Sequence, residues 1–150
     1  DIDSHLADDI AYALDKVSRS AFSISLSGVS CFGGKKPHSV FAGVAPSTGL
    51  SQLQAEQERI CQRLGLGADS RKFTPHITLA RLKNSAPEQV AHYLTGRGDF
   101  STLPFKIARF VLMSSKDSVG GGPYIIEEAY PLREPQAVSA GEAQAAVWGH

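Results

Sequence analysis

The feature that most limits the fold of this chain is a pair of hairpin-like stretches, each with two apolar segments joined by a glycine-rich link. In the first stretch, residues 22–28 and 38–44 flank the link CFGGKKP. In the second, residues 104–115 and 123–132 flank the link KDSVGGG. Parallel strands need a long crossover connection, so these short links predict antiparallel pairing. The alternation in FSISLSG is typical of a half-buried strand.

Three other segments have the apolar spacing of amphipathic helices. Their ranges are 4–17, 51 to about 64, and 87 to about 94. The expected N-caps, in the same order, are Asp3 or Ser4, Ser51 in a capping box with Gln54, and Ser85. With a further strand near residue 76, the order becomes helix, strand, strand, helix, strand, helix, strand, strand. This order predicts an α+β fold rather than a doubly wound parallel sheet.

Composition limits the possible functions. The 150 residues are 42% hydrophobic and 20% charged, which is typical of a single globular domain. No run of 18 apolar residues indicates a membrane span. The formal net charge is zero, which argues against a long nucleic-acid duplex as partner. Cys31 and Cys61 form no CxxC pair, so we expect reduced thiols and a cytoplasmic protein. We expect the domain to cover residues 1–133 and residues 134–150 to form a flexible tail.

The stretch RKFTPHITLARL, residues 71–82, carries the polar groups with the clearest chemical use. Strict alternation along a strand places His76, Thr78 and Ala80 on one face. We expect this face to line a cleft, with Ile77 and Leu79 buried on the other side. A histidine transfers protons near neutral pH, and a hydroxyl can donate to an anionic oxygen. From spacing alone, an edge strand with a polar outer face remains an alternative.

Arg81 could supply positive charge to the same site. Strict alternation, however, places it on the Ile77 face, so it reaches the site only if the strand bends. A surface salt bridge is the alternative role.

The segment FTPHITLAR resembles the second H-x-T/S-apolar signature of the two-histidine (2H) phosphoesterases. Within them, it is most similar to the 2′-5′ RNA ligase-like group of RNA 2′,3′-cyclic phosphodiesterases. Residues 22–44 resemble that family's strand, glycine turn and return strand, and residues 110–132 resemble its closing strand pair. The resemblance covers roughly residues 1–132.

The resemblance implies two lobes of antiparallel sheet, with helices on the outer faces and a central cleft. It implies a metal-independent phosphodiesterase that opens 2′,3′-cyclic phosphates to 2′-phosphates, with possible 2′-5′ RNA ligase activity. His76 and Thr78 would be catalytic, His76 as base, and Thr78 and Arg81 would bind substrate. We expect no cofactor or metal, RNA ends or short oligonucleotides as partners, and a monomer. The histidines also lack HxH and HxxxH spacing, which argues against a metal hydrolase.

One departure from the family pattern matters. The family needs two such motifs, and this sequence has one. The other histidines are His5, His38, His92 and His150, and none is followed by the pattern. We therefore expect the chain to lack the fold's N-terminal strand, which would leave a sheet edge open. The alternative is a catalytically incomplete RNA- or nucleotide-binding module. Weaker site candidates are Ser115, Tyr124, Lys35 and Lys36.

Overall fold

The computed structural model describes residues 2–115 and 124–134 of the chain. Its helices are α1 (Ser4–Leu14), α2 (Thr48–Arg63) and α3 (Pro87–Leu94). Its strands are β1 (Phe22–Ile24), β2 (Leu26–Phe32), β3 (Ser39–Val44), β4 (His76–Arg81), β5 (Phe105–Ile107), β6 (Arg109–Ser115) and β7 (Tyr124–Pro131). The predicted loop at 116–122 and nearly all of the predicted tail lie outside the described residues.

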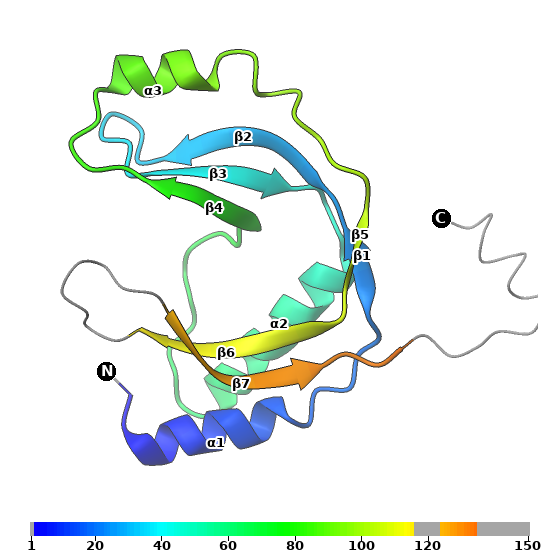
Figure 1. Cartoon of the computed structure of the whole chain (residues 1–150). Coiled ribbons are helices and arrows are strands. Elements are labelled where there is room, and N and C mark those ends of the chain that lie inside the picture. The colour runs from blue at the N-terminus through cyan, green and yellow to red at the C-terminus, as the bar shows by residue number, and fades with distance from the viewer. Residues whose placement is uncertain (1, 116–123, 135–150) are drawn as a thin grey trace, which may run out of the picture.

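The strands form antiparallel sheets. One has the order β2-β3-β4, and two strand pairs are β1-β5 and β6-β7. In Figure 1 the β2-β3-β4 sheet and the β6-β7 pair face each other, with β1 and β5 at one end. Helix α3 lies outside the first sheet and α1 outside the β6-β7 pair. The prediction of an α+β fold with antiparallel sheets is confirmed.

Two of the predicted strands are each divided in two. The chain leaves the β1-β5 pair at Ser25 and enters the larger sheet at Leu26. The Leu26 N–H donates to Thr102 Oγ1 at 2.9 Å, and the Ser25 carbonyl accepts from the Ala45 N–H at 2.9 Å. The second division lies at Ala108, whose carbonyl accepts from the Leu132 N–H at 2.8 Å. These long-range bonds redirect the backbone where the apolar pattern continues unbroken.

Two of the three helices have a different N-cap from the predicted one. For α1 the predicted N-cap Asp3 is correct, because its Oδ1 accepts from the Leu6 N–H at 2.8 Å. Helix α2 begins one turn earlier than predicted, with Ser47 as the N-cap that accepts from Leu50 N–H. Ser51 therefore lies inside the helix, and its N–H donates to the Ser47 carbonyl. Helix α3 has Ala86 rather than Ser85 at the N-cap position, without a side-chain cap.

The main apolar cluster joins α1 to the β6-β7 pair. Its buried members are Ile10, Leu14 and Tyr130. The residues packed around them are Leu6, Ile60, Leu64, Leu66, Phe110 and Leu112. The Tyr130 ring stacks on Phe110 with centroids 4.8 Å apart, and its hydroxyl donates to the Ala11 carbonyl at 2.9 Å. Helix α1 is thereby fixed to the outer face of this sheet.

Cys31 and Cys61 are both free thiols and both partly buried, as expected from their spacing. Burial, with Glu58 nearby, raises the pKa of the Cys61 thiol, which therefore stays protonated at neutral pH. Across the described ranges, no helix has the length and apolar character needed to span a bilayer.

Candidate active site

Strand β4 carries the motif and lies at the edge of the three-stranded sheet. Its pairing with β3 contains one irregularity, at Leu79, which has no partner in the register. Such a β-bulge places two residues of one strand opposite one residue of the other. His76 pairs with Gly43, Thr78 with Phe41, and Arg81 with Ser39. Gly43, Phe41 and Ser39 alternate along β3 and share one face. His76, Thr78 and Arg81 therefore share that face as well.

The bulge overturns the expectation from strict alternation. Arg81 does not lie on the same face as Ile77. Because Leu79 is an extra residue in β4, Arg81 lies on the same face as His76. Ala80 is not beside His76, because it pairs with Val40. Ala80, Leu79 and Val40 line a second cavity together with Val90 of α3. The small residue beside the motif therefore faces α3 rather than the site.

The expected burial of Ile77 and Leu79 is also wrong. Their exposed fractions are 41% and 53%. The physical reason is the edge position: within the described residues, β4 pairs with β3 on one side only. Ile77 lines the same cavity as His76 instead of a closed core. In the part of the chain that the structure describes, the outer edge of β4 has no strand partner.

The imidazole of His76 is held by three groups. The rings of Phe32 and Phe41 lie edge-on to it, with centroids 4.9 and 5.4 Å away. Its Nδ1 lies 2.6 Å from the Thr74 carbonyl oxygen. A carbonyl oxygen only accepts hydrogen bonds, so Nδ1 carries a proton, and in the neutral imidazole Nε2 has the free lone pair. The geometry therefore presents Nε2 as a proton acceptor.

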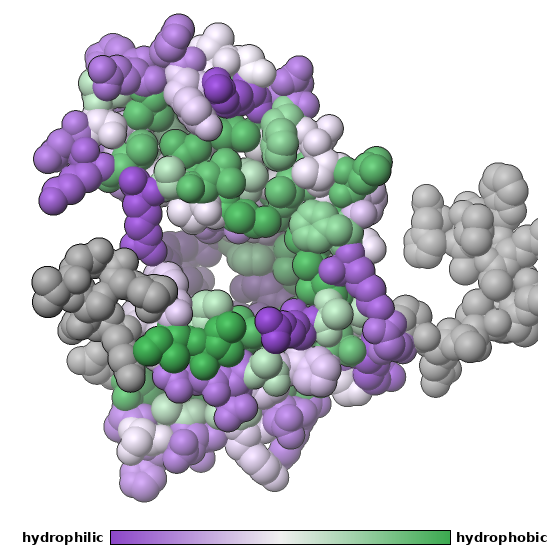
Figure 2. Space-filling model, viewed as in Figure 1, coloured by the Kyte–Doolittle hydropathy of each residue, from purple (hydrophilic) through white to green (hydrophobic). Residues whose placement is uncertain are grey.

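His76 opens into a cavity of about 860 Å³. Its lining contains both apolar and polar residues. The apolar members include Ile24, Phe32, Val44, Leu50, Phe73 and Ile77; the polar ones include His38, Gln54, Glu58, Asp69, Arg71, Lys72 and Thr74. Figure 2 shows the surface hollowed between the two facing sheets, with apolar residues on both sides of the hollow. The volume is near the upper end for small-ligand pockets.

Arg81 reaches toward the opposite sheet. Its Nη2 donates to the Tyr124 hydroxyl at 3.4 Å, and its guanidinium carbon lies 5.9 Å from the centre of that ring. Tyr124 is the first residue of β7 and pairs with Ser115. The face shared by His76, Thr78 and Arg81 is therefore turned toward the β6-β7 pair. Of the described residues, neither Thr78 nor Arg81 lines the 860 Å³ cavity itself.

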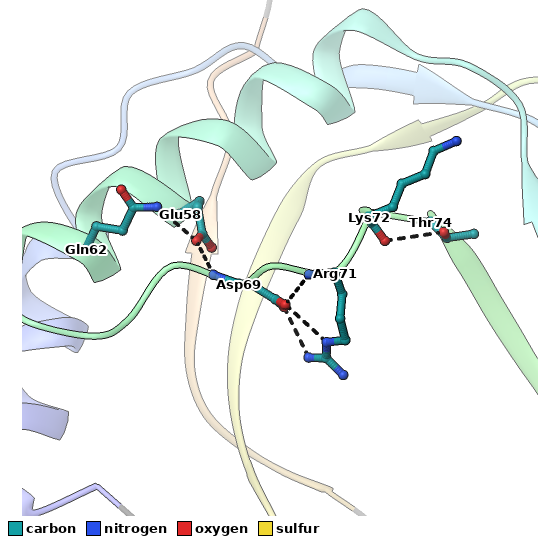
Figure 3. Close-up of polar contacts among 6 residues, drawn as sticks. All are labelled: Glu58, Gln62, Asp69, Arg71, Lys72 and Thr74. Carbon is teal, nitrogen blue, oxygen red and sulfur yellow. Dashed lines mark hydrogen bonds and ion pairs between the residues drawn. The ribbon is translucent and has the colours of Figure 1, made fainter.

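The segment before β4 is organised by two carboxylates, as Figure 3 shows. Glu58 Oε1 accepts from the Asp69 N–H at 3.0 Å and from Gln62 Nε2 at 3.1 Å. Asp69 Oδ1 accepts from the backbone N–H and Nε of Arg71, at 3.0 and 3.1 Å. Its Oδ2 accepts from Arg71 Nη2 at 3.1 Å. These hydrogen bonds from Arg71 lower the pKa of the Asp69 carboxyl, which keeps it ionised at neutral pH.

The sequence shows Arg71 and Lys72 as basic residues before the strand. No role in the site was predicted for Asp69 or Glu58. The D-x-R spacing at Asp69 was the available signal, because an Asp side chain often bonds the backbone two residues on. Glu58 had no such signal, since it lies 11 residues away on α2.

The remaining histidines are not all near the site. His5 lies on α1 and His92 on α3, both exposed. His38 lines the same cavity as His76 and stacks on Phe32 with centroids 6.3 Å apart. His150 lies outside the described residues. Lys35 and Lys36 lie in the exposed β2-β3 turn and do not line this cavity.

Within residues 2–115 and 124–134, no three His, Cys, Asp or Glu side chains gather as a metal site would require.

Comparison with known proteins decides the family. Residues 44–124, which include the bulged strand and the loop before it, match the family described as LigT like Phosphoesterase. The chain belongs to this family. The match covers more than half of the 150 residues and contains His76, Thr78, Arg81 and Tyr124.

Two curated relatives of this LigT-like phosphoesterase are both described as RNA 2′,3′-cyclic phosphodiesterases. The protein from Aeropyrum pernix is 31% identical over 87 residues, which are 57% of this chain and 49% of the relative. The protein from Geobacillus stearothermophilus is 38% identical over 61 residues, which are 40% of this chain and 19% of the relative. The chain thus spans at most about half the length of these relatives.

Solved structures share the fold. E. coli LigT complexed with 3′-AMP has a TM-score of 0.66 at 19% identity, over 89% of this chain and 72% of that one. TT0787 of Thermus thermophilus has a TM-score of 0.69 at 22% identity, over 91% of this chain and 75% of that one. At these identities the similarity shows the fold alone.

Proposed function

We propose that this LigT-like phosphoesterase is a metal-independent RNA 2′,3′-cyclic phosphodiesterase that opens cyclic phosphate ends to 2′-phosphates. The observation that carries the proposal is the 2.6 Å contact between His76 Nδ1 and the Thr74 carbonyl, which leaves Nε2 available as a base at a large cavity. The two curated relatives described as RNA 2′,3′-cyclic phosphodiesterases support the substrate class.

The reaction needs one base and one acid. The oxygen of a water molecule attacks phosphorus, and its proton passes to His76 Nε2. The bond between phosphorus and O3′ breaks, its electron pair stays on O3′, and a general acid supplies the proton that completes the 3′-hydroxyl. If a 5′-hydroxyl of a second RNA replaces water, the same steps form a 2′-5′ linkage, which is the proposed ligase activity.

Thr78 and Arg81 would stabilise charge on the phosphoryl oxygens. Thr78 is two residues from His76 on the same face of β4, so its hydroxyl is suited to donate to a non-bridging oxygen. Arg81 would exchange its contact with Tyr124 for the phosphate, because a charged oxygen is the stronger acceptor. Its long side chain already points into the space between the sheets.

The same reaction needs a general acid for the departing O3′. In-line displacement requires acid and base on opposite sides of phosphorus, whereas His38 directly precedes β3, the strand that pairs with β4. His38 lines the same cavity and remains the candidate within the described residues. The presence of one H-x-T motif in the 150 residues favours a second candidate function, a nucleotide-binding module without turnover.

One experiment separates the two functions. The purified chain is incubated with a dinucleotide ending in a 2′,3′-cyclic phosphate, in excess chelator, and products are resolved by chromatography. We expect a 2′-phosphate product, loss of turnover in His76→Ala, and no change in His92→Ala, an exposed histidine on α3. Tight binding without turnover would establish the binding module. Turnover that chelator abolishes, or that survives in His76→Ala, would overturn the mechanism.

A further inference from the structure

We infer that the α2–β4 loop forms a second subsite, in which Arg71 binds the phosphate of the nucleotide preceding the cyclic phosphate end. This inference rests on the proposed function, because it takes His76 to mark the position of the cyclic phosphate. It assigns to the loop a preference for oligonucleotides over mononucleotides. Phe73, which is 42% exposed on the same loop and lines the same cavity, would supply an aromatic face for the adjoining base.

The guanidinium of Arg71 is fixed in a way that leaves a phosphate-binding edge open. Asp69 accepts hydrogen bonds from Nε and Nη2, which form one edge of the planar group. A guanidinium has five N–H donors, so Nη1 and the second N–H of Nη2 remain on the other edge. That edge has the fork geometry that matches two oxygens of one phosphate. The Arg71 side chain is 87% exposed, so a ligand can reach it.

The two carboxylates that line the cavity, Glu58 and Asp69, are both engaged in hydrogen bonds. Glu58 is bonded to the Asp69 N–H and to Gln62, and Asp69 is bonded to Arg71. Both carboxylates therefore serve to hold the loop and its arginine. Preorganisation of this kind lowers the entropy lost when the ligand binds. Figure 3 shows that Arg71 and Lys72 leave the loop in different directions, so the two cations do not act as one group.

The position of the subsite suits a strand of RNA rather than a single nucleotide. Arg71 and His76 both line the 860 Å³ cavity. Five residue steps separate them, which is at most about 17 Å of extended chain. A short oligonucleotide can therefore contact both, with its reacting end at His76 and its preceding phosphate at the loop. Stacking on Phe73 would be tolerant of base identity, because every base has an aromatic face.

The test compares a mononucleotide with a dinucleotide, both ending in a 2′,3′-cyclic phosphate, in chelator. The variants are Arg71→Ala and the matched control Arg63→Ala, which removes an exposed arginine at the end of α2. We expect Arg71→Ala to weaken binding of the dinucleotide, with Kd and KM about tenfold higher or more, because it removes a charge-assisted hydrogen-bond pair. The Kd and KM of the mononucleotide, and kcat for both substrates, should be unchanged. For the dinucleotide, the slope of log Kd against log salt should fall by about 0.7.

The binding measurements do not depend on turnover, so the subsite and the proposed function can fail separately. A chain that turns over neither ligand but loses dinucleotide affinity in Arg71→Ala keeps the subsite and refutes the enzyme. Equal weakening of both ligands, an equal effect of Arg63→Ala, or no effect at all would overturn the subsite. So would a wild-type chain that binds neither ligand.

Discussion

Removal of one hydroxyl should measure how firmly α1 is held on the β6-β7 pair. Tyr130 is 5% exposed, and its hydroxyl donates to the Ala11 carbonyl at 2.9 Å. Tyr130→Phe keeps the ring stacked on Phe110 and deletes this hydrogen bond. The Ala11 carbonyl still accepts from the Asp15 N–H at 3.3 Å, so it is not left without a partner. The free energy of unfolding should therefore fall by about 1 kcal/mol, rather than by a full desolvation penalty.

Urea denaturation followed by circular dichroism measures this change. At about 2 kcal/mol per molar urea, the midpoint should fall by about 0.5 M. Tyr12→Phe is the matched control, because Tyr12 lies on the same helix and is 68% exposed. Equal midpoints for the two variants would refute the assigned hydrogen bond. A loss above about 3 kcal/mol would show that the ring itself had moved.

Wild type and Tyr130→Phe can also be compared at alkaline pH. Burial, with Glu128 and Asp15 nearby, raises the pKa of the Tyr130 phenol. Its stabilising contribution is complete below the ordinary tyrosine pKa of about 10 and is lost as pH rises through the raised value. Tyr130→Phe has no such ionisation. The difference in unfolding free energy between wild type and variant should therefore shrink above about pH 10, and a constant difference would contradict the assignment.

Other predictions concern the motif and a helix start. Thr78→Ala should lower kcat on a cyclic-phosphate dinucleotide by about a hundred- to a thousandfold, while Thr78→Ser should retain most of the activity; equal rates would remove Thr78 from catalysis. Arg81→Ala should mainly raise KM in the same assay, and Tyr124→Phe should change it little; a pure loss of kcat would mean that Arg81 acts only in the transition state. Ser47→Ala should destabilise the protein by about 1 kcal/mol in urea denaturation, whereas Ser51→Ala should cost much less, and the reverse order would restore the predicted start of α2.

Local signals in the sequence were enough to place most elements. Asp3 caps α1 and Pro87 opens α3, as their residue types predict. Ser47 and Ser51 are chemically equivalent caps, so the choice between them depended on where the chain turns after Pro46. The motif in FTPHITLAR alone is weak evidence; the family was indicated because several further segments matched in the correct order.

The strand divisions could not be predicted, because their causes lie far away in the chain. Ser25 and Ala108 lie inside unbroken strand-like patterns. Leu26, which follows Ser25, bonds to Thr102, and Ala108 itself bonds to Leu132. The faces of β4 were also mispredicted for a non-local reason. The side-chain order along β4 depends on which residue β3 leaves unpaired, and that residue is Leu79.

After the unpaired residue Leu79, the side chains of β4 alternate in the opposite order between the two faces of the sheet. The motif positions His76, Thr78 and Arg81 are separated by two and then three residues, which no uninterrupted ladder can keep on one side. An uneven spacing of this kind among polar residues is therefore itself a signature of an irregular strand. Insertion of one residue into β3 opposite Leu79 would make the pairing regular. His76 and Thr78 would then stay on one face, and Arg81 would turn to the opposite face. The irregularity thus brings His76, Thr78 and Arg81 to one face of β4.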